Sequence, residues 1–311
     1  MPGKVALGAF LVQNAPMPWT EGYIAVDWGT TNRRAYRLDG QGACVASFED
    51  GRGVLSVDTG GFPGAAGEIR QRLGDLPLLL AGMVGSTRGW MEAPYVACPA
   101  SLGDLAERLC WIEPGKIAIV PGLAIQGDGK ADVMRGEEVQ LFGAIASGLI
   151  PATCFVGHPG THNKWVSVVG GRIADFRTVM TGELFAMLRE RGILAEMLDG
   201  EVTLGEAFRA GARRGLCGPT LTAELFSVRA GVLLGTMTRE SAPSYVSGLL
   251  IGADVGVGLG RADGSEMIIM GDSDLTRLYA AAASAGGHDV REIDGEAAFL
   301  AGATALAELI R

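Results

Sequence analysis

The sequence is poor in the side chains that build disulfides and zinc sites. Its 311 residues include three histidines and five cysteines, an odd number with no C-x-x-C pair. This pattern favours free thiols in a reducing compartment over a disulfide framework. His158 and His162 are four residues apart, but Pro159 and Gly160 between them disfavour the helix on which such a pair would bind zinc.

Basic clusters and long apolar runs are also missing. The net charge is −9 and the 26 basic residues are scattered, so nucleic acid is not an expected partner. No segment reaches the roughly 18 uninterrupted apolar residues of a membrane span. The apolar run near the N-terminus is broken by Gly8 and Gln13, and we interpret residues 1–22 as an extension rather than a signal peptide. We therefore expect a cytoplasmic protein with no membrane partner.

Glycine, in contrast, is abundant. Its 48 residues are about twice the usual share of roughly 7%, and most of them separate short apolar runs, as turns of an α/β protein do. Residues 23–48 and 152–179 each show strands joined by glycine turns, and helical and strand-like segments follow both. We predict two related α/β domains, residues 23–150 and 151–311, with a cleft between them. A loop rich in glycine and aspartate is expected between Gly122 and Arg135.

An acid, a glycine and two hydroxyls follow the first apolar strand. A tight turn through Gly29-Thr30-Thr31 can present N–H groups and hydroxyls to a phosphate, and Asp27 can hold Mg²⁺. The alternative is a capped surface turn, and the spacing alone does not decide between them. Gly160-Thr161 begins a second turn of similar build, and two such turns facing one cleft would clamp a triphosphate. No G-x-x-x-x-G-K-[ST] motif is present.

Two acids stand at a loop-to-helix entry in DVMRGEEVQL. A glutamate in the first helical turn is favoured by the helix dipole, so simple capping is one interpretation. The other is that Glu137 or Glu138 faces the cleft as a general base, while Arg135 binds an anionic group of a substrate. Adjacent helical residues point about 100° apart, so only one of the two acids can easily take this role.

A loop of polar and aromatic residues follows the buried strand at residues 76–85. It contains Ser86, Arg88 and Trp90, at the strand edge where open α/β sheets bind small molecules. A covered loop with Trp90 in the core is the competing interpretation.

Five segments taken together make the chain similar to the 2-keto-3-deoxygalactonokinase family. They occur in order from about Tyr23: IAVDWGTTNRRAY, LAGMVGSTRGWMEAPY, VMRGEEVQLFGA, PGTHNKWV and FRTVMTGELF. The resemblance implies two actin-like (ribonuclease H-like) domains with an interdomain cleft. It also implies phosphorylation of 2-dehydro-3-deoxy-D-galactonate at its 6-hydroxyl by ATP with Mg²⁺, a step of galactonate catabolism. It leaves a homodimer open.

The resemblance also implies roles for single residues. Related sugar kinases place their catalytic aspartate where this chain has Glu137, which makes Glu137 the expected base, although the adjacent Glu138 leaves the register open by one. His158 stands where many relatives carry an acid, so more of the metal coordination would fall to Asp27 and the ATP phosphates. The nucleotide residues implied are Asp27, Gly29, Thr30, Thr31, Gly160, Thr161, Gly271, Asp272 and Ser273. The sugar-acid residues are Ser86, Arg88, Trp90 and Arg135.

Two other functions remain compatible with these motifs. A kinase of another keto-deoxy or aldonic acid would keep the phosphate turns and differ in residues 84–98 and 132–138. A non-catalytic actin-like nucleotide switch would lack a base and a sugar pocket, and the acidic loop at Glu137 argues against it. Thr181 and Glu183 receive no role beyond the start of a helix.

Overall fold

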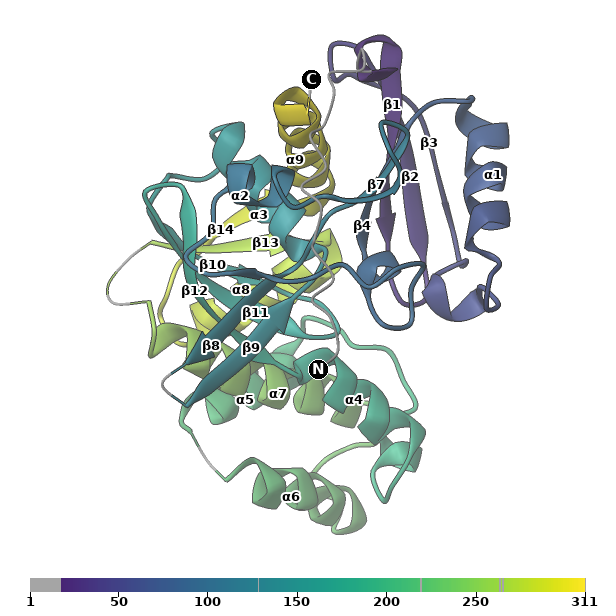
Figure 1. The fold of residues 1–311 in the computed structure, drawn as a ribbon. Coiled ribbons are helices and arrows are strands. Elements are labelled where there is room, and N and C mark those ends of the chain that lie inside the picture. Colours follow the sequence, from purple (N-terminus) through teal and green to yellow (C-terminus); the bar gives the residue numbers. More distant parts are fainter. Residues whose placement is uncertain (1–17, 128, 219, 263, 265, 311) are drawn as a thin grey trace, which may run out of the picture.

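Two main β-sheets with flanking helices build the protein (Figure 1). The structure is a computed structural model, and it describes residues 18–310 except 128, 219, 263 and 265. The first sheet has the strand order β3-β2-β1-β4-β7-β6 and the second has the order β12-β11-β10-β13-β14. The mixed α/β architecture expected from the sequence is therefore confirmed.

The first sheet begins as the expected antiparallel meander and continues with parallel strands. Each strand of the meander pairs with the next through the turns at residues 29–32 and 40–43, and β4 then pairs with β1 in parallel. β7 adds to β4 in parallel, and β6 closes the edge. The strands are β1 (Gly22–Trp28), β2 (Arg33–Asp39), β3 (Cys44–Asp50), β4 (Leu78–Gly82), β6 (Cys110–Glu113) and β7 (Ile117–Ile119).

The second sheet has the same arrangement of strands. An antiparallel meander comes first, and two parallel strands then extend the sheet from β10. Its strands are β10 (Cys154–His158), β11 (Asn163–Val169), β12 (Arg172–Val179), β13 (Met267–Gly271) and β14 (Arg291–Asp294). Because both sheets carry parallel strands beside a hairpin, the carboxyl ends of β1 and of β10 each lie at a sheet edge where a ligand can be bound.

The segment expected to be a loop before Arg135 is instead a hairpin, so that expectation is wrong. β8 (Leu123–Gly127) pairs antiparallel with β9 (Lys130–Met134), and β5 (Val96–Ala97) completes a small sheet. Ala131 and Val133 of β9 are exposed and only Met134 is buried, so the strand lacks the alternation that would have identified it. The hairpin delivers Arg135 to the start of α3.

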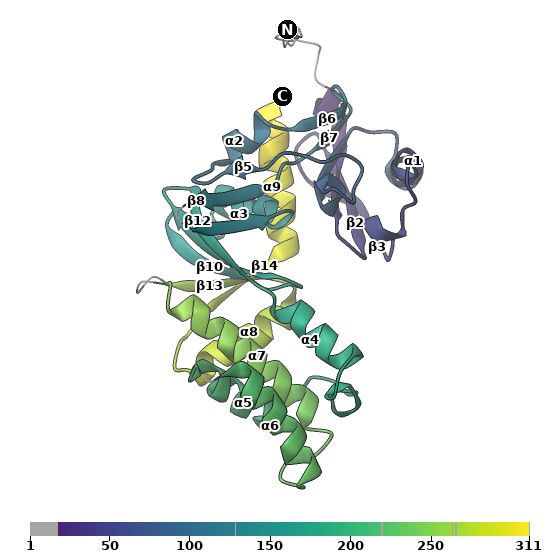
Figure 2. The same ribbon diagram turned by 60° about the horizontal axis from the view of Figure 1, so that its bottom comes forward.

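The helices have the following bounds. They are α1 (Phe62–Leu73), α2 (Leu102–Ala106), α3 (Glu137–Ala146), α4 (Thr181–Glu190), α5 (Glu206–Leu216), α6 (Leu221–Leu233), α7 (Ala242–Leu259), α8 (Ser273–Ala285) and α9 (Gly295–Ile310). The 3₁₀ turns are η1 (Pro18–Glu21), η2 (Val54–Ser56), η3 (Met83–Gly85) and η4 (Ala195–Met197). Helices α4 to α7 gather on the side of the second sheet that faces away from the first sheet (Figure 2).

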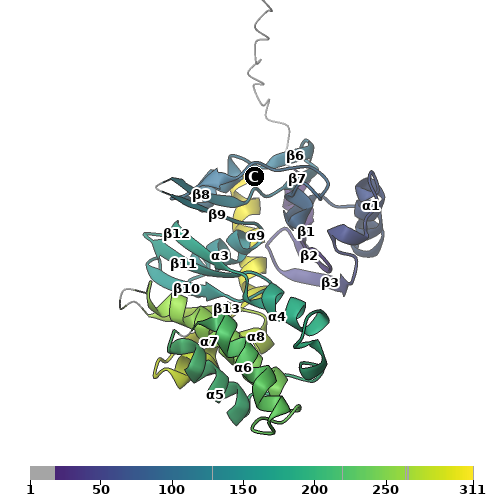
Figure 3. The ribbon, with the colours of Figure 1, turned by 90° about the horizontal axis from the view of Figure 1, so that it is seen from below.

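Helix α9 runs between the two main sheets, beside α3 (Figure 3). Phe299 of α9 packs on Tyr36 of β2 with 5.7 Å between the ring centroids, and one apolar core continues from the first sheet through α9 to the second. The last helix of the chain thus packs against its first hairpin. A division of the chain near residue 150 stays a prediction.

Two further segments bear on expectations from the sequence. Residues 1–17 of the expected N-terminal extension lie outside the described residues, whereas Trp19 is fully buried and donates a hydrogen bond to the carbonyl of Gly115 (3.0 Å). Helix α7 is long and apolar enough to cross a membrane by length and composition alone. Since 72% of it is buried inside the protein, it has the character of a core helix.

Candidate active site

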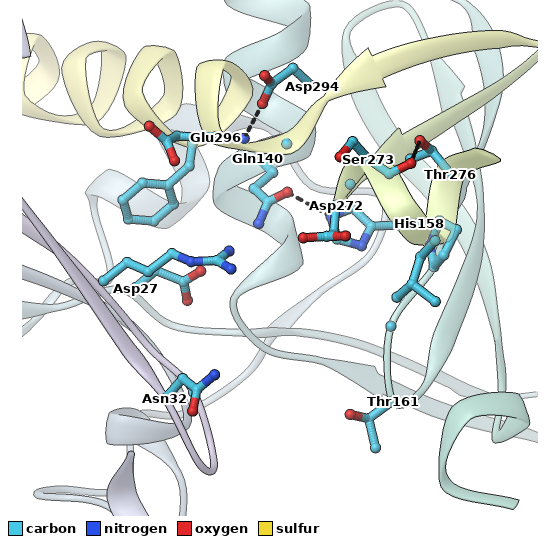
Figure 4. A pocket seen from close by; sticks show the side chains of 18 of the residues that line it. Asp27, Asn32, Gln140, His158, Thr161, Asp272, Ser273, Thr276, Asp294 and Glu296 are labelled. Carbon is cyan, nitrogen blue, oxygen red and sulfur yellow. Dashed lines mark hydrogen bonds between the residues drawn. The ribbon is translucent and has the colours of Figure 1, made fainter. Parts of the chain in front are cut away.

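A cavity of about 800 Å³ lies between the two main sheets, a size typical of small-molecule sites. In Figure 4, Asp27 and Asn32 border it from the first hairpin, and Thr161 and His158 border it from the second. The cavity brings together every residue that the sequence suggested for nucleotide binding. These are Asp27, Gly29, Thr30, Thr31, Gly160, Thr161, Gly271, Asp272 and Ser273. Their individual roles stay predictions.

The turn between β1 and β2 is supported by backbone hydrogen bonds, both within the turn and from residues 53–55. Gly29 donates to the carbonyl of Asn32 (2.9 Å) and closes the hairpin between β1 and β2. The carbonyls of Gly29, Thr30 and Thr31 accept hydrogen bonds from Val54, Leu55 and Gly53, at 3.0, 3.2 and 2.8 Å. A Cβ atom on Gly53 would stand only 2.4 Å from the Thr30 carbonyl carbon, so only glycine fits here. Because backbone groups support the turn, the hydroxyls of Thr30 and Thr31 remain available to a ligand in the cavity.

Asp27 stands at the end of β1 among charges of both signs. Burial raises its pKa to about 6, the Arg34 guanidinium opposes this, and the Glu137 and Glu49 carboxylates add to it. Arg34 is the cross-strand partner of Asp27 in the hairpin. A cation beside Asp27 would relieve the repulsion between these carboxylates, so the site is chemically suited to one.

The second turn places its two histidines in different surroundings. His158 is buried and its Nε2 contacts the side-chain oxygen of Gln140 on α3 (2.8 Å), and burial lowers its pKa, so it is neutral near pH 7. His162 instead pairs with Glu183 of α4 (2.5 Å). Among residues 18–310, apart from the four undescribed positions, no three His, Cys, Asp or Glu side chains are placed to share a metal ion. Mg²⁺ held by one carboxylate and phosphate oxygens needs no such cluster.

The third border of the cavity comes from the ends of β13 and β14. The Asp272 carboxylate caps α8 by accepting from the N–H of Asp274 (3.0 Å), and Asp294 accepts from Glu296 at the start of α9 (2.7 Å). Asp294 was not expected at the site, although an acid just before a helix is an N-cap signature. Other lining residues that were not expected are Asn32, Arg34, Tyr36, Glu49, Gln140, Thr276, Glu292, Glu296 and Phe299.

The two adjacent glutamates differ in environment. The Glu138 side chain is fully buried, its Oε2 accepts from the N–H of Gly136 (2.7 Å), and burial together with Glu137 raises its pKa to about 8. Glu137 is 18% exposed, and its Oε1 lies 2.5 Å from Nζ of Lys164 on β11. Burial raises the pKa of Glu137, but Lys164 and His158 outweigh that effect and hold it below the usual value. At neutral pH Glu137 is an ionised carboxylate, whereas Glu138 is protonated.

Arg135 faces the loop after β4 rather than the nucleotide cavity. Its Nη2 donates to the carbonyl of Ala93 (2.7 Å), and its guanidinium lies 4.4 Å from the Tyr95 ring centroid. Its Nε and Nη1 are buried and have no hydrogen-bond partner within the described part of the chain. Each is an unused donor for a ligand oxygen, but the two lie on different edges of the guanidinium and cannot hold one carboxylate as a pair.

Of the other three residues suggested for the sugar acid, Ser86 and Arg88 make contacts within their own loop, whereas Trp90 packs on α1. Ser86 donates to the carbonyl of Met83 (2.7 Å) and accepts from the N–H of Arg88 (3.2 Å). Trp90 stacks on Phe62 with 6.1 Å between ring centroids, which fits the core interpretation as well as the pocket one. None of the three lines the cavity.

Comparison with known proteins agrees with this geometry. Residues 27–306 match the family model described as 2-keto-3-deoxy-galactonokinase. The chain is 39% identical to the 2-dehydro-3-deoxygalactonokinase of Escherichia coli K12 over 294 residues, which cover 94% of this chain and 99% of the relative. A Rhizobium meliloti protein provisionally named as the same enzyme is 36% identical, with 93% and 97% covered.

Solved structures agree in fold. A crystal structure from Sinorhizobium meliloti, of a protein provisionally named as a 2-dehydro-3-deoxygalactonokinase, superposes with a TM-score of 0.86 at 35% identity and covers 93% of this chain and 99% of that one. Component A of the (R)-2-hydroxyglutaryl-CoA dehydratase of Acidaminococcus fermentans shares the fold alone, with a TM-score of 0.52 at 13% identity over 93% and 99% of the chains. The expected actin-like fold is thus confirmed. The chain belongs to the 2-keto-3-deoxygalactonokinase family, and it is a kinase.

Proposed function

We propose that the protein transfers the γ-phosphoryl group of ATP to the 6-hydroxyl of 2-dehydro-3-deoxy-D-galactonate. The bond between O6 and phosphorus forms, the bond from phosphorus to the β-γ bridging oxygen breaks, and ADP leaves. The products are 2-dehydro-3-deoxy-6-phosphogalactonate and ADP, and the hydroxyl proton passes to a base on the protein. Such a reaction asks the enzyme mainly to position its substrates and to neutralise charge.

The single observation that carries this proposal is the meeting of two glycine-threonine turns at one cavity. Thr30 and Thr31 border it from the first sheet, and Gly160 and Thr161 border it from the second. Hydroxyls and backbone N–H groups from two sides can hold a phosphate chain between them. The adenosine would then lie toward Gly271, Asp272 and Ser273, at the carboxyl end of β13.

Glu137 is the proposed base. It is ionised and partly exposed, and it is near enough to Asp27 to raise the pKa of that residue. A carboxylate with these properties can accept the 6-hydroxyl proton as the oxygen attacks. Arg135 is proposed to bind the carboxylate of the sugar acid through one of its unpartnered nitrogens, with Ser86, Arg88 and Trp90 shaping the surrounding loop.

Asp27 is the proposed metal-facing residue. Its carboxylate lies in the cavity beside both phosphate turns, and the neighbouring acids make a cation favourable there. Mg²⁺ bound with the nucleotide would neutralise negative charge on the phosphates. We further propose that the enzyme is cytoplasmic and that it has two domains, residues 23–150 and 151–311. A homodimer stays a prediction.

An assay of ADP release across a panel of keto-deoxy and aldonic acids tests the proposal. We expect turnover to be highest with 2-dehydro-3-deoxy-D-galactonate. Faster turnover with another sugar acid would reassign the substrate within the same fold. Tight ATP binding without turnover of any of these acids would contradict the kinase function and favour a nucleotide switch.

A further inference from the structure

A buried carboxylate in the middle of α7 accepts four side-chain hydrogen bonds. Asp254 is 1% exposed, and it does not line the nucleotide cavity. Its Oδ1 accepts from Asn163 Nδ2 (2.9 Å) and from Trp165 Nε1 (2.7 Å). Its Oδ2 accepts from the hydroxyls of Thr181 (2.6 Å) and Tyr279 (2.5 Å). A charge this deeply buried is tolerated because both of its oxygens are fully hydrogen-bonded.

The four donors come from three elements, of which α8 lines the cavity and the other two adjoin the second turn. Asn163 and Trp165 begin β11, immediately after the second phosphate turn at residues 159–162. Thr181 is the first residue of α4. Tyr279 lies in α8, whose first turn lines the cavity with Ser273 and Thr276. One carboxylate therefore links β11, which follows the second turn, to α4 and α8.

The start of α4 also packs directly on the second turn. The N–H of Glu183 donates to the carbonyl of Thr161 (3.0 Å), and the Glu183 carboxylate pairs with His162 (2.5 Å). A Cβ atom on Gly182 would stand 2.6 Å from the Gly160 carbonyl oxygen, so backbone touches backbone there. Fixing Thr181 through Asp254 thus fixes the backbone that supports Gly160 and Thr161.

We propose that Asp254 is a positioning residue that holds the second phosphate turn in its binding conformation through Asn163 and Thr181. The inference rests on the proposed role of this turn in binding the phosphates of ATP. A turn that is already ordered loses less conformational freedom when the ligand binds, so affinity is gained without a direct contact. The segment TVMTGELF, which had no function in the sequence analysis, becomes part of this support.

The test compares the affinities of MgATP and adenosine, measured by titration calorimetry. Thr181→Val keeps the shape of the side chain and removes the donor, whereas Thr181→Ser keeps the hydroxyl. We expect Thr181→Val to weaken MgATP binding about tenfold, the scale of one charge-assisted hydrogen bond, with adenosine binding nearly unchanged. Thr181→Ser should restore most of the affinity. Asp254→Asn, which puts an amide donor among four donors, should show the same selectivity for phosphate if it folds.

Val255→Ala is the matched control for stability. Val255 is the next residue of α7, is fully buried in the apolar core and takes no part in the hydrogen-bond network. It should lower the melting temperature while leaving the ratio of the two affinities unchanged. The inference is overturned if folded Thr181→Val binds MgATP as the wild type does, or if Val255→Ala shifts the ratio equally. A wild-type protein that binds adenosine as tightly as MgATP would contradict the proposed function itself, and with it the role of Asp254.

Discussion

Glu137 on α3 and Lys164 on β11 form an ion pair across the two halves of the fold, with 2.5 Å between Oε1 and Nζ. Both side chains are largely buried, at 18% and 7% exposure. Nζ of Lys164 also donates to the carbonyl of His162 in the second phosphate turn (3.0 Å). The ammonium thus connects the proposed base with the second of the two turns proposed to hold the phosphates.

Glu137→Gln should abolish most of the turnover. A general base contributes about 10²- to 10⁴-fold to the rate, and a neutral amide cannot accept the hydroxyl proton. Glu138→Gln is the matched control, because Glu138 is already protonated at neutral pH and faces the interior. Steady-state kcat of the two variants decides between them. The assignment is wrong if Glu138→Gln loses the activity and Glu137→Gln keeps it.

Lys164→Met should move the acid limb of the pH profile of kcat/KM to higher pH. The titratable and charged groups around Glu137 are Lys164, His158, Asp27 and Glu138. Lys164 is the main group that lowers the Glu137 pKa against the effect of burial, so without it the pKa should rise. Lys164→Arg keeps the charge, so its acid limb should stay near the pH of the wild-type limb. An unchanged limb in Lys164→Met would show that the ion pair does not tune the base.

Glu138 should make the protein less stable as the pH rises. The folded protein holds the Glu138 proton up to about pH 8, whereas the ordinary glutamate pKa of the unfolded chain is 4.5. Between these values unfolding releases a proton, so the free energy of unfolding falls with pH by at most about 1.4 kcal/mol per unit. Glu138→Gln lacks this proton. Its melting temperature should therefore rise relative to wild type between pH 5 and pH 8, and parallel curves would contradict the shifted pKa.

The parts of the site that the sequence could predict are those encoded locally. Turn chemistry at Gly29-Thr30-Thr31 and at Gly160-Thr161 identified two hairpin turns that the structure places at one cavity. Helical geometry could say that only one of Glu137 and Glu138 would easily take the role of base, but not which of them would be partly exposed. That choice depends on the depth at which α3 is buried, and burial is a property of packing between distant segments.

Other features depend on contacts that no local pattern contains. The hydrogen bonds to Asp254 join residues as far apart in the chain as Asn163 and Tyr279. The pocket border at Asp294 exists because β14 pairs in parallel with β13, and a strand as short as Arg291–Asp294 leaves little alternation to detect. Arg135 lies against the polar loop after β4, and its stacking on Tyr95 depends on the β8–β9 hairpin, which was not expected.

Arg135→Met should raise KM for the sugar acid and leave KM for ATP nearly unchanged. Loss of a charge-assisted contact to the carboxylate corresponds to roughly 10- to 100-fold in affinity. Arg108→Met is the control, because Arg108 is an exposed arginine just after α2 and is none of the proposed site residues. Since Arg135 also packs on Tyr95, melting temperatures should accompany the kinetics. Equal effects on both substrates would assign Arg135 to folding rather than to substrate binding.

Gly302→Ala should destabilise the junction of the two halves. A Cβ atom at Gly302 of α9 would stand 2.0 Å from the carbonyl oxygen of Val139 on α3, because the two helices cross with their backbones in contact. Overpacking of this kind costs about 1–3 kcal/mol, and the helices must separate to relieve it.

Gly67→Ala is the control, since Gly67 lies in α1 with no atom within 4 Å of the added methyl group. That change should instead stabilise by about 0.5–1 kcal/mol through helix propensity. Denaturant unfolding of both variants measures these opposite changes in the free energy of unfolding. If Gly302→Ala gains stability as Gly67→Ala does, the close crossing of α3 and α9 is not a constraint on the fold.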